Sequence, residues 1–356
     1  MKKDLSLTPH TIVRGGKNEY CILSCIRRDG MGYTYIAEPV NRHKGLPNKV
    51  VIREHFMPHC SERGTDGITV VTPEEIAPTV ENCRTIFEKC SRVRFEISSI
   101  SPSVISVIDI FNANNTFYYV VEFLDGITFE EYVKQKGPLS WEETRELLSP
   151  IFDAVKIMHS RRSIHTEIQP RHIRFVHHKG EYIPVLFSLY ASLHFNEEER
   201  QMWALPIMTC ETGFAPPEQY GNIENFTPQT DIYALAATIV FALSGKKLPD
   251  SRVVTEKIIR ATLPPALPEN TVQALIHALH PDIAQRTASV SAFRDELREF
   301  YGGRRREIDD DEHYESVWKE ILNQDRIPLA IVGVAIIAAL FIFFMRRNVC
   351  IGNIFY

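Results

Sequence analysis

The first third of the chain alternates short runs of β-branched and aromatic residues with turns. Tyr33–Ala37, Lys49–Arg53 and Tyr118–Phe123 are such runs, and this composition is typical of strands. Asn112–Asn115 predicts a turn before the last of them, because asparagine tolerates turn conformations. Residues 80–97 have a more helical pattern. These features predict a small, β-rich unit that contains one helix.

From about residue 140 the pattern becomes helical. Ser140 followed by Glu143 predicts a capping box at a helix start. An apolar stripe follows at helical spacing, formed by Leu147, Leu148, Ile151, Phe152, Val155 and Met158. Asp231–Ser244 is apolar nearly all round, which predicts a buried helix. Thr271–Leu279 and Val290–Phe300 are further predicted helices. The fold class predicted is α+β, with a β-rich lobe, a crossing near Glu122–Gly126 and a larger helical lobe.

The segment Ile327–Met345 is an uninterrupted apolar run of 19 residues, flanked by Arg326 and by Arg346 and Arg347. About 20 such residues cross a bilayer core, so the run predicts one C-terminal transmembrane helix. No apolar run follows the start of the chain, and this predicts no signal peptide. We therefore expect a single-pass membrane protein whose N-terminal part is cytoplasmic.

The predicted organisation has five parts. Residues 1–19 are an N-terminal extension, and residues 20–301 are the two-lobed domain, with lobes at about 20–124 and 125–301. A charged juxtamembrane linker (302–326), the transmembrane helix (327–345) and a short tail (346–356) follow. Within the linker, apolar residues recur at helical spacing at Tyr314, Val317, Trp318 and Ile321. Two interpretations are equally compatible with this stripe: an amphipathic helix on the lipid surface, or a short helix packed on the domain.

Composition narrows the choice of function. The 356 residues are 44% hydrophobic and 24% charged with a net charge of −5, so no basic excess indicates nucleic-acid binding. The seven cysteines include the close pairs Cys21/Cys25 and Cys83/Cys90, neither with zinc-ligand spacing. We expect free thiols and no metal site.

Several segments, in order, resemble the protein kinase family over about residues 20–301, and the resemblance is to a bacterial Ser/Thr kinase with a C-terminal membrane anchor. They are Asp29-Gly30-Met31-Gly32-Tyr33-Thr34-Tyr35, Val51-Ile52-Arg53-Glu54, Val121-Glu122-Phe123-Leu124, His165-Thr166-Glu167-Ile168-Gln169-Pro170-Arg171-His172, Phe214-Ala215-Pro216-Pro217-Glu218, Asp231-Ile232-Tyr233-Ala234-Leu235 and Pro281-Asp282 to Arg286. The resemblance implies a two-lobed protein-kinase-like fold.

The resemblance also assigns nucleotide-contacting positions, which are Gly30 and Gly32 of the glycine-rich loop, Arg53, and the hinge residues Glu122, Phe123 and Leu124. Arg53 stands where the ATP-contacting lysine is expected, and a guanidinium is not interchangeable with an ammonium. The helix glutamate that normally partners this lysine is unassigned. Counting from Pro102 gives Arg92, and shifted registers give Cys90 or Glu88.

The catalytic positions implied by the resemblance are altered. Glu167 stands at the general-base position, Gln169 replaces a lysine, His172 replaces a metal-binding asparagine, and Ser188 replaces a metal-binding aspartate. Mg²⁺ prefers oxygen ligands, so imidazole is a poor substitute. The doublet His177-His178 is interpreted as a hairpin tip, not a metal site.

By contrast, four residues match positions that have architectural roles in kinases. The resemblance implies that His165 packs in the core and that Asp231 holds the backbone of the catalytic loop. It also implies that Glu218 and Arg286 form the pair that locks the activation segment. Retained architecture with altered chemistry predicts a pseudokinase that regulates or scaffolds protein partners at the cytoplasmic membrane face. ATP binding would be weak or metal-independent, with Mg²⁺ not expected, and a homodimer is compatible with the sequence. The alternatives are an active Ser/Thr kinase with Glu167 as base, and an occluded interaction domain.

Overall fold

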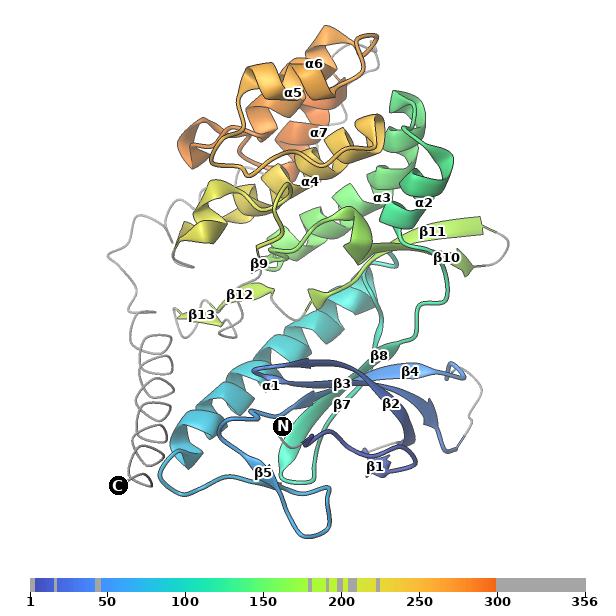
Figure 1. Ribbon diagram of the computed structural model, residues 1–356, viewed down its shortest axis with the longest axis vertical. Helices are drawn as coiled ribbons and strands as arrows, with labels where there is room; N and C mark the ends of the chain where they lie inside the picture. The colour runs from blue at the N-terminus through green and yellow to red at the C-terminus, as the bar shows by residue number, and fades with distance from the viewer. Residues whose placement is uncertain are drawn as a thin grey trace, which may run out of the picture.

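The computed structural model describes residues 4–15, 18–41, 46–178, 181–189, 192–196, 201–203, 210–221 and 225–298. A sheet-based N-terminal lobe and a helical C-terminal lobe follow one another along the long axis of the molecule (Figure 1). This arrangement confirms the predicted two-lobed fold. The predicted transmembrane segment 327–345 lies outside the described residues, and within them no helix is long and apolar enough to cross a bilayer.

The N-terminal lobe is built on a six-stranded antiparallel sheet with the order β1-β2-β3-β4-β8-β7. The strands are β1 (Ile12–Arg14), β2 (Glu19–Asp29), β3 (Gly32–Pro39), β4 (Val50–His55), β7 (Val107–Ala113) and β8 (Thr116–Glu122). The turn predicted from paired asparagines joins β7 to β8, with positive φ angles of 50° at Asn114 and 58° at Asn115. A small hairpin, β5 (Glu62–Arg63) and β6 (Val70–Val71), follows β4.

Helix α1 (Ala77–Ile100) packs on the sheet against β7 and β8. Its buried residues are Val80, Cys83, Phe87, Cys90, Ser91, Arg94 and Ile97, a stripe at three- and four-residue spacing that faces the core. The helix predicted at 80–97 is therefore present and longer than its sequence pattern suggested.

The C-terminal lobe contains α2 (Phe129–Lys136), α3 (Trp141–Ser160), α4 (Pro228–Ser244), α5 (Glu256–Thr262), α6 (Glu269–Ala278) and α7 (Val290–Arg298). Helix α4 is buried along almost its whole length, as its apolar sequence predicts. Short strands lie between α3 and α4: β9 (Ser163–Ile164), β10 (Ile173–His178), β11 (Glu181–Leu186), β12 (Leu193–Asn196) and β13 (Gln201–Trp203).

Only one of the two hydrogen bonds of the capping box predicted at Ser140 is formed. The Ser140 hydroxyl accepts a hydrogen bond from the Glu143 backbone N–H at 3.1 Å. The Glu143 carboxylate does not return to the backbone of Ser140, because it accepts the Tyr132 hydroxyl at 2.7 Å instead. A complete box forms one helix earlier, between Thr128 and Glu131 at the start of α2.

Candidate active-site cleft

The cleft between the two lobes has a volume of about 250 Å³. Small-molecule sites usually span about 300–1,000 Å³, so the volume of this cleft lies just below that range. Of the predicted nucleotide-contacting residues, Arg53, Glu122, Phe123 and Leu124 line it, whereas Gly30 and Gly32 do not. So does Ser188, which comes from the segment after β11.

Arg53 is held at the back of the cleft by groups of the β2–β3 hairpin. Its Nη2 donates to Asp29 Oδ1 at 2.6 Å, and its Nη1 donates to Thr34 Oγ1 at 3.0 Å. The residue is only 3% exposed. A carboxylate from the glycine-rich loop therefore neutralises the cation that would otherwise meet the phosphates of a nucleotide.

The two retained glycines of this hairpin differ in their surroundings. A Cβ at Gly30 would meet nothing within 4 Å, whereas a Cβ at Gly32 would lie 1.9 Å from the Glu54 carbonyl oxygen. Gly32 is thus required for the close approach of β3 to β4, independently of any ligand.

Helix α1 presents an arginine to the cleft. Glu88 and Arg92, two of the candidates for the missing glutamate, form an ion pair with each other, and the Arg92 side chain is 58% exposed. Cys90, the third, is buried in the α1 core stripe. The residue that reaches the cleft is Arg94, whose guanidinium lies 5.7 Å from the centroid of the Tyr119 ring. None of the three candidate residues lines the cleft, and the position of the partner glutamate stays unassigned. Arg94 lies on the same buried stripe of α1 as Cys83, Phe87 and Cys90.

The hinge side of the cleft is occupied by protein groups. The Glu122 carboxylate accepts the backbone N–H of Ser106 at 2.9 Å. Arg174 of β10 donates from Nη1 to the Leu124 carbonyl at 3.0 Å, and its guanidinium lies 5.5 Å from the Phe187 ring centroid. Sequence reasoning missed Arg174 as a residue that lines the cleft, although it lies only two residues after His172.

The altered catalytic positions contact one another. The Ser188 hydroxyl donates to Glu167 Oε2 at 3.1 Å, and Ser188 has a positive φ of 69°. His172 donates from Nδ1 to the Glu167 carbonyl at 2.8 Å, and Gln169 Nε2 lies 3.2 Å from the same ring nitrogen. Burial lowers the pKa of His172 to about 4, so its ring is neutral at pH 7. Within the described residues no cluster of three or more His, Cys, Asp or Glu side chains could hold a metal ion.

Asp231 lies beneath this loop. Fully buried, its carboxylate accepts the backbone N–H groups of His165 and Thr166, each at 2.8 Å. His159 Nε2 lies 2.8 Å from the same carboxylate. The His165 ring donates from Nε2 to the Phe187 carbonyl at 3.0 Å and accepts the Glu167 N–H on Nδ1 at 3.1 Å. This pattern describes a neutral ring, and burial correspondingly lowers the pKa of His165.

Glu218 and Arg286 meet in a buried bidentate pair, with Nη1–Oε1 at 2.7 Å and Nη2–Oε2 at 3.1 Å. The Arg286 side chain is 0% exposed and that of Glu218 is 5% exposed. Removal of one partner from such a pair costs about 3–5 kcal/mol, so this contact fixes the segment after Phe214 to the lobe.

Among the described residues, the space beside Glu167 on the side of the segment Glu211–Gln219 is small. The cavity between the catalytic loop and the segment Glu211–Gln219 measures about 10 Å³. This volume holds about one water molecule, not a side chain. The Gln219 side chain closes it from one side by donating to the Thr166 carbonyl at 2.7 Å.

Comparison with known proteins agrees with this geometry. The family profile described as "Protein kinase domain" matches residues 83–296. The chain is 26% identical over 242 residues to serine/threonine-protein kinase D of Synechocystis sp., covering 65% of this chain and 42% of that protein. It is 26% identical over 235 residues to the probable serine/threonine-protein kinase PknB of Lactococcus lactis, covering 63% of this chain and 36% of that protein. The match thus spans less than half the length of either relative.

Among solved structures, a crystal structure of the PknI kinase domain of Mycobacterium tuberculosis is similar with a TM-score of 0.55 and 16% sequence identity. The match covers 83% of this chain and 98% of that one. At this identity the similarity shows a shared fold.

Proposed function

Because the chain belongs to the protein kinase domain family, we propose that it acts as a pseudokinase, a kinase-like regulatory or scaffolding module in signalling that does not transfer phosphate. The observation that carries this proposal is the hydrogen bond of 3.1 Å from Ser188 to Glu167. It joins the position expected to hold metal to the position expected to accept the substrate proton.

Phosphoryl transfer depends on metal ions that bridge the phosphates and on a base that orients the nucleophile. Ser188 carries no charge for a metal, and the neutral ring of His172 is already bonded to the Glu167 backbone. The Glu167 carboxylate in turn accepts the Ser188 hydroxyl, which competes with a substrate hydroxyl for it. These contacts support loss of the transfer step.

We propose that any nucleotide binds weakly and without Mg²⁺. The cleft is lined by Arg27, Arg53, Arg94 and Arg174, against one acidic lining residue, Glu122. Arginine side chains grip phosphate directly without a metal. Affinity is limited because Asp29 already neutralises Arg53 and because Arg174 already holds the Leu124 carbonyl.

For its setting in the cell, we propose a single membrane span at 327–345 and protein partners at the cytoplasmic membrane face. The support is the apolar run itself, which is long enough to cross a bilayer core. A homodimer through the span or the linker is compatible with this arrangement.

The test is a melting curve of the purified full chain in excess ATP, recorded once with Mg²⁺ and once with EDTA, beside a phosphotransfer assay. Ligand at 100 times its dissociation constant stabilises a protein by about 2.7 kcal/mol, which a melting curve detects. We expect a small shift of equal size in both conditions and no transfer.

A shift that requires Mg²⁺ would contradict the proposal. Transfer that is lost in Glu167→Gln would establish the active-kinase alternative, with Glu167 as base. No shift in either condition would favour the occluded interaction domain and direct the search to protein partners.

A further inference from the structure

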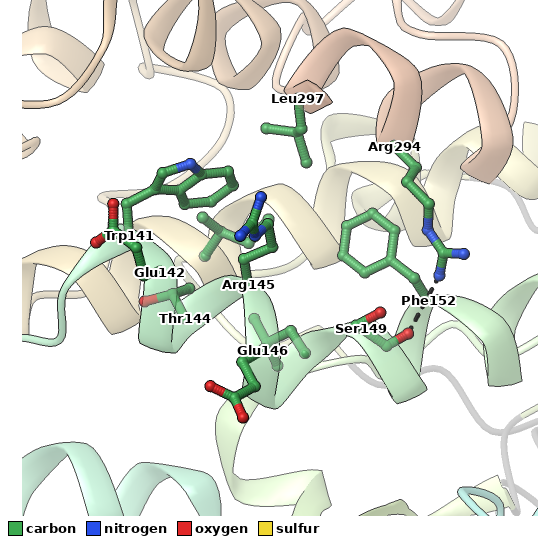
Figure 2. A pocket seen from close by; sticks show the side chains of 11 residues that line it. Trp141, Glu142, Thr144, Arg145, Glu146, Ser149, Phe152, Arg294 and Leu297 are labelled. Carbon is green, nitrogen blue, oxygen red and sulfur yellow. Dashed lines mark hydrogen bonds between the residues drawn. The ribbon is translucent and has the colours of Figure 1, made fainter. Parts of the chain in front are cut away.

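A groove on the helical lobe lies between α3, α4 and α7 and shares no lining residue with the cleft. Its volume is about 470 Å³, well within the range of binding sites of about 300–1,000 Å³. Its apolar surface is contributed by Trp141, Leu148, Phe152, Ile239 and Leu297. Figure 2 shows Trp141 and Phe152 projecting from α3 on the side where Leu297 and Arg294 extend from α7.

The walls of the groove are fastened to each other. Arg294 of α7 donates from Nη1 to Asp153 Oδ1 at 2.7 Å and from Nη2 to the Ser149 carbonyl at 3.1 Å. Its guanidinium also lies 5.6 Å from the Phe152 ring centroid. These contacts to α3 hold the groove open, so an occupant would enter a preformed site.

The position of the groove relative to the chain indicates what could fill it. Helix α7 ends at Arg298, one residue after Leu297 of the groove wall. Fifteen residues, 299–313, then separate this wall from the apolar stripe that begins at Tyr314. A spacer of this length reaches up to about 50 Å when extended, and tethers of such length give an effective concentration on the order of millimolar.

We propose that the segment Tyr314–Ile321 of this chain docks in the groove between α3 and α7. Its apolar residues, Tyr314, Val317, Trp318 and Ile321, have the i, i+3, i+4, i+7 spacing with which a helix fills an apolar groove. This assignment favours packing on the domain over the lipid surface for the stripe.

The groove rim carries charges of both signs, with Glu142 and Glu146 on either side of Arg145 in the sequence. Arg145 is exposed on the rim and forms no ion pair within the described part of the chain. The acidic run Asp309–Glu312 lies one residue before the docking segment; its sign is opposite to that of Arg145 and the same as that of Glu142 and Glu146, so the assignment rests on the apolar spacing and the tether length and not on charge. The docking does not depend on whether the cleft transfers phosphate.

Photocrosslinking in the full chain, mixed with phospholipid vesicles, tests the proposal. The photoreactive residue p-benzoylphenylalanine is placed at Trp318 and, as a matched control, at Ser316, which lies on the opposite side of the stripe. We expect the probe at 318 to crosslink to peptides of α3 or α7 about five-fold more than the probe at 316, because docking aligns one face of the segment.

Mixing isotope-labelled and unlabelled chains separates links within one chain from links between two copies. Ser149→Arg places a long charged side chain in the groove and should reduce the links from position 318, while a melting curve checks that the lobe remains folded. Links only to lipid, links only between two copies, or equal yields from 316 and 318 would each overturn the proposal.

Discussion

At the scale of single residues, Arg174 changes what the cleft can accept. Its guanidinium holds the Leu124 carbonyl at 3.0 Å and lies over the Phe187 ring. A guanidinium is charged at every accessible pH and is bulky, so it takes both a hydrogen-bond acceptor and volume from the hinge end of the cleft. A flat, uncharged ligand at that end must displace it.

Arg174→Leu should therefore increase the affinity for adenosine by about ten-fold, which corresponds to about 1.4 kcal/mol or roughly one hydrogen bond. Adenosine is the appropriate probe because it lacks phosphates, so the lost positive charge does not enter the comparison. Isothermal calorimetry measures the change. Arg171→Leu is the matched control, since Arg171 pairs with Glu211 and does not line the cleft. Equal affinities for both variants would show that Arg174 does not limit binding.

At the scale of elements, the β2–β3 hairpin retains Gly32 of the glycine-rich loop, but packing against β4 requires this glycine, independently of any nucleotide. Its tip approaches β4 through Gly32, where a Cβ would lie 1.9 Å from the Glu54 carbonyl oxygen. The same hairpin supplies Asp29 to Arg53. The hairpin is thus fastened to the sheet by packing and charge, where a nucleotide-binding loop would be free to cover phosphates.

Gly32→Ala should destabilise the domain by about 1–3 kcal/mol, because the methyl group overpacks against backbone that cannot rotate away. Gly30→Ala in the same hairpin should leave the free energy of unfolding nearly unchanged, since nothing lies within 4 Å of its Cβ. Chemical denaturation of the two variants compares them directly. If both lose the same stability, the close approach of β3 to β4 is not the reason that Gly32 is required.

Several elements of the fold were predictable from the sequence. Alternation and turn residues predicted β3, β4 and β8, and the all-apolar run predicted α4, because these signals are local. The motif order placed Asp231 beneath the catalytic loop and Glu218 beside Arg286, where the structure brings them together.

Features that depend on distant geometry were not predictable. Arg94 faces the cleft because of the rotation of α1 about its own axis, and this rotation follows from the packing of α1 on β7 and β8. Arg174 reaches the hinge because Gly126 allows β10 to approach closely, with a Cβ there only 1.9 Å from the Phe175 carbonyl oxygen. The contact of Ser188 with Glu167 depends on the left-handed backbone at Ser188, which the residue type does not indicate.

At the scale of the whole molecule, neutral histidines are buried in both lobes. Desolvation lowers the pKa of His55 to about 3 in the N-terminal lobe. It lowers those of His172 and His194 to about 4 in the C-terminal lobe. In the unfolded chain these rings titrate near pH 6.5, so the unfolded state binds more protons at mildly acidic pH.

Stability should therefore be greatest above about pH 6.5 and fall as the pH decreases toward the folded-state values of about 3 and 4. At about pH 5 each of these histidines should cost roughly 2 kcal/mol, so together they approach the net stability of a typical domain. Urea unfolding between about pH 7.5 and 5 measures this slope. His55→Phe should make it shallower, and an unchanged stability over this interval would contradict the prediction.

Strand β4 carries its two charges on opposite faces. Arg53 is bound to Asp29 on the cleft side, while the fully buried Glu54 accepts Tyr35, Tyr118 and both Nη atoms of Arg63 on the other. A slip of one residue would place either Glu54 beside Asp29 or Arg53 beside Arg63, depending on its direction, so like charges would meet on one face in either case. This strand can pair in one register only. A lysine at position 53 would preserve the same arrangement of charge, so an exchange between lysine and arginine there alters the chemistry of the cleft while the sheet stays aligned.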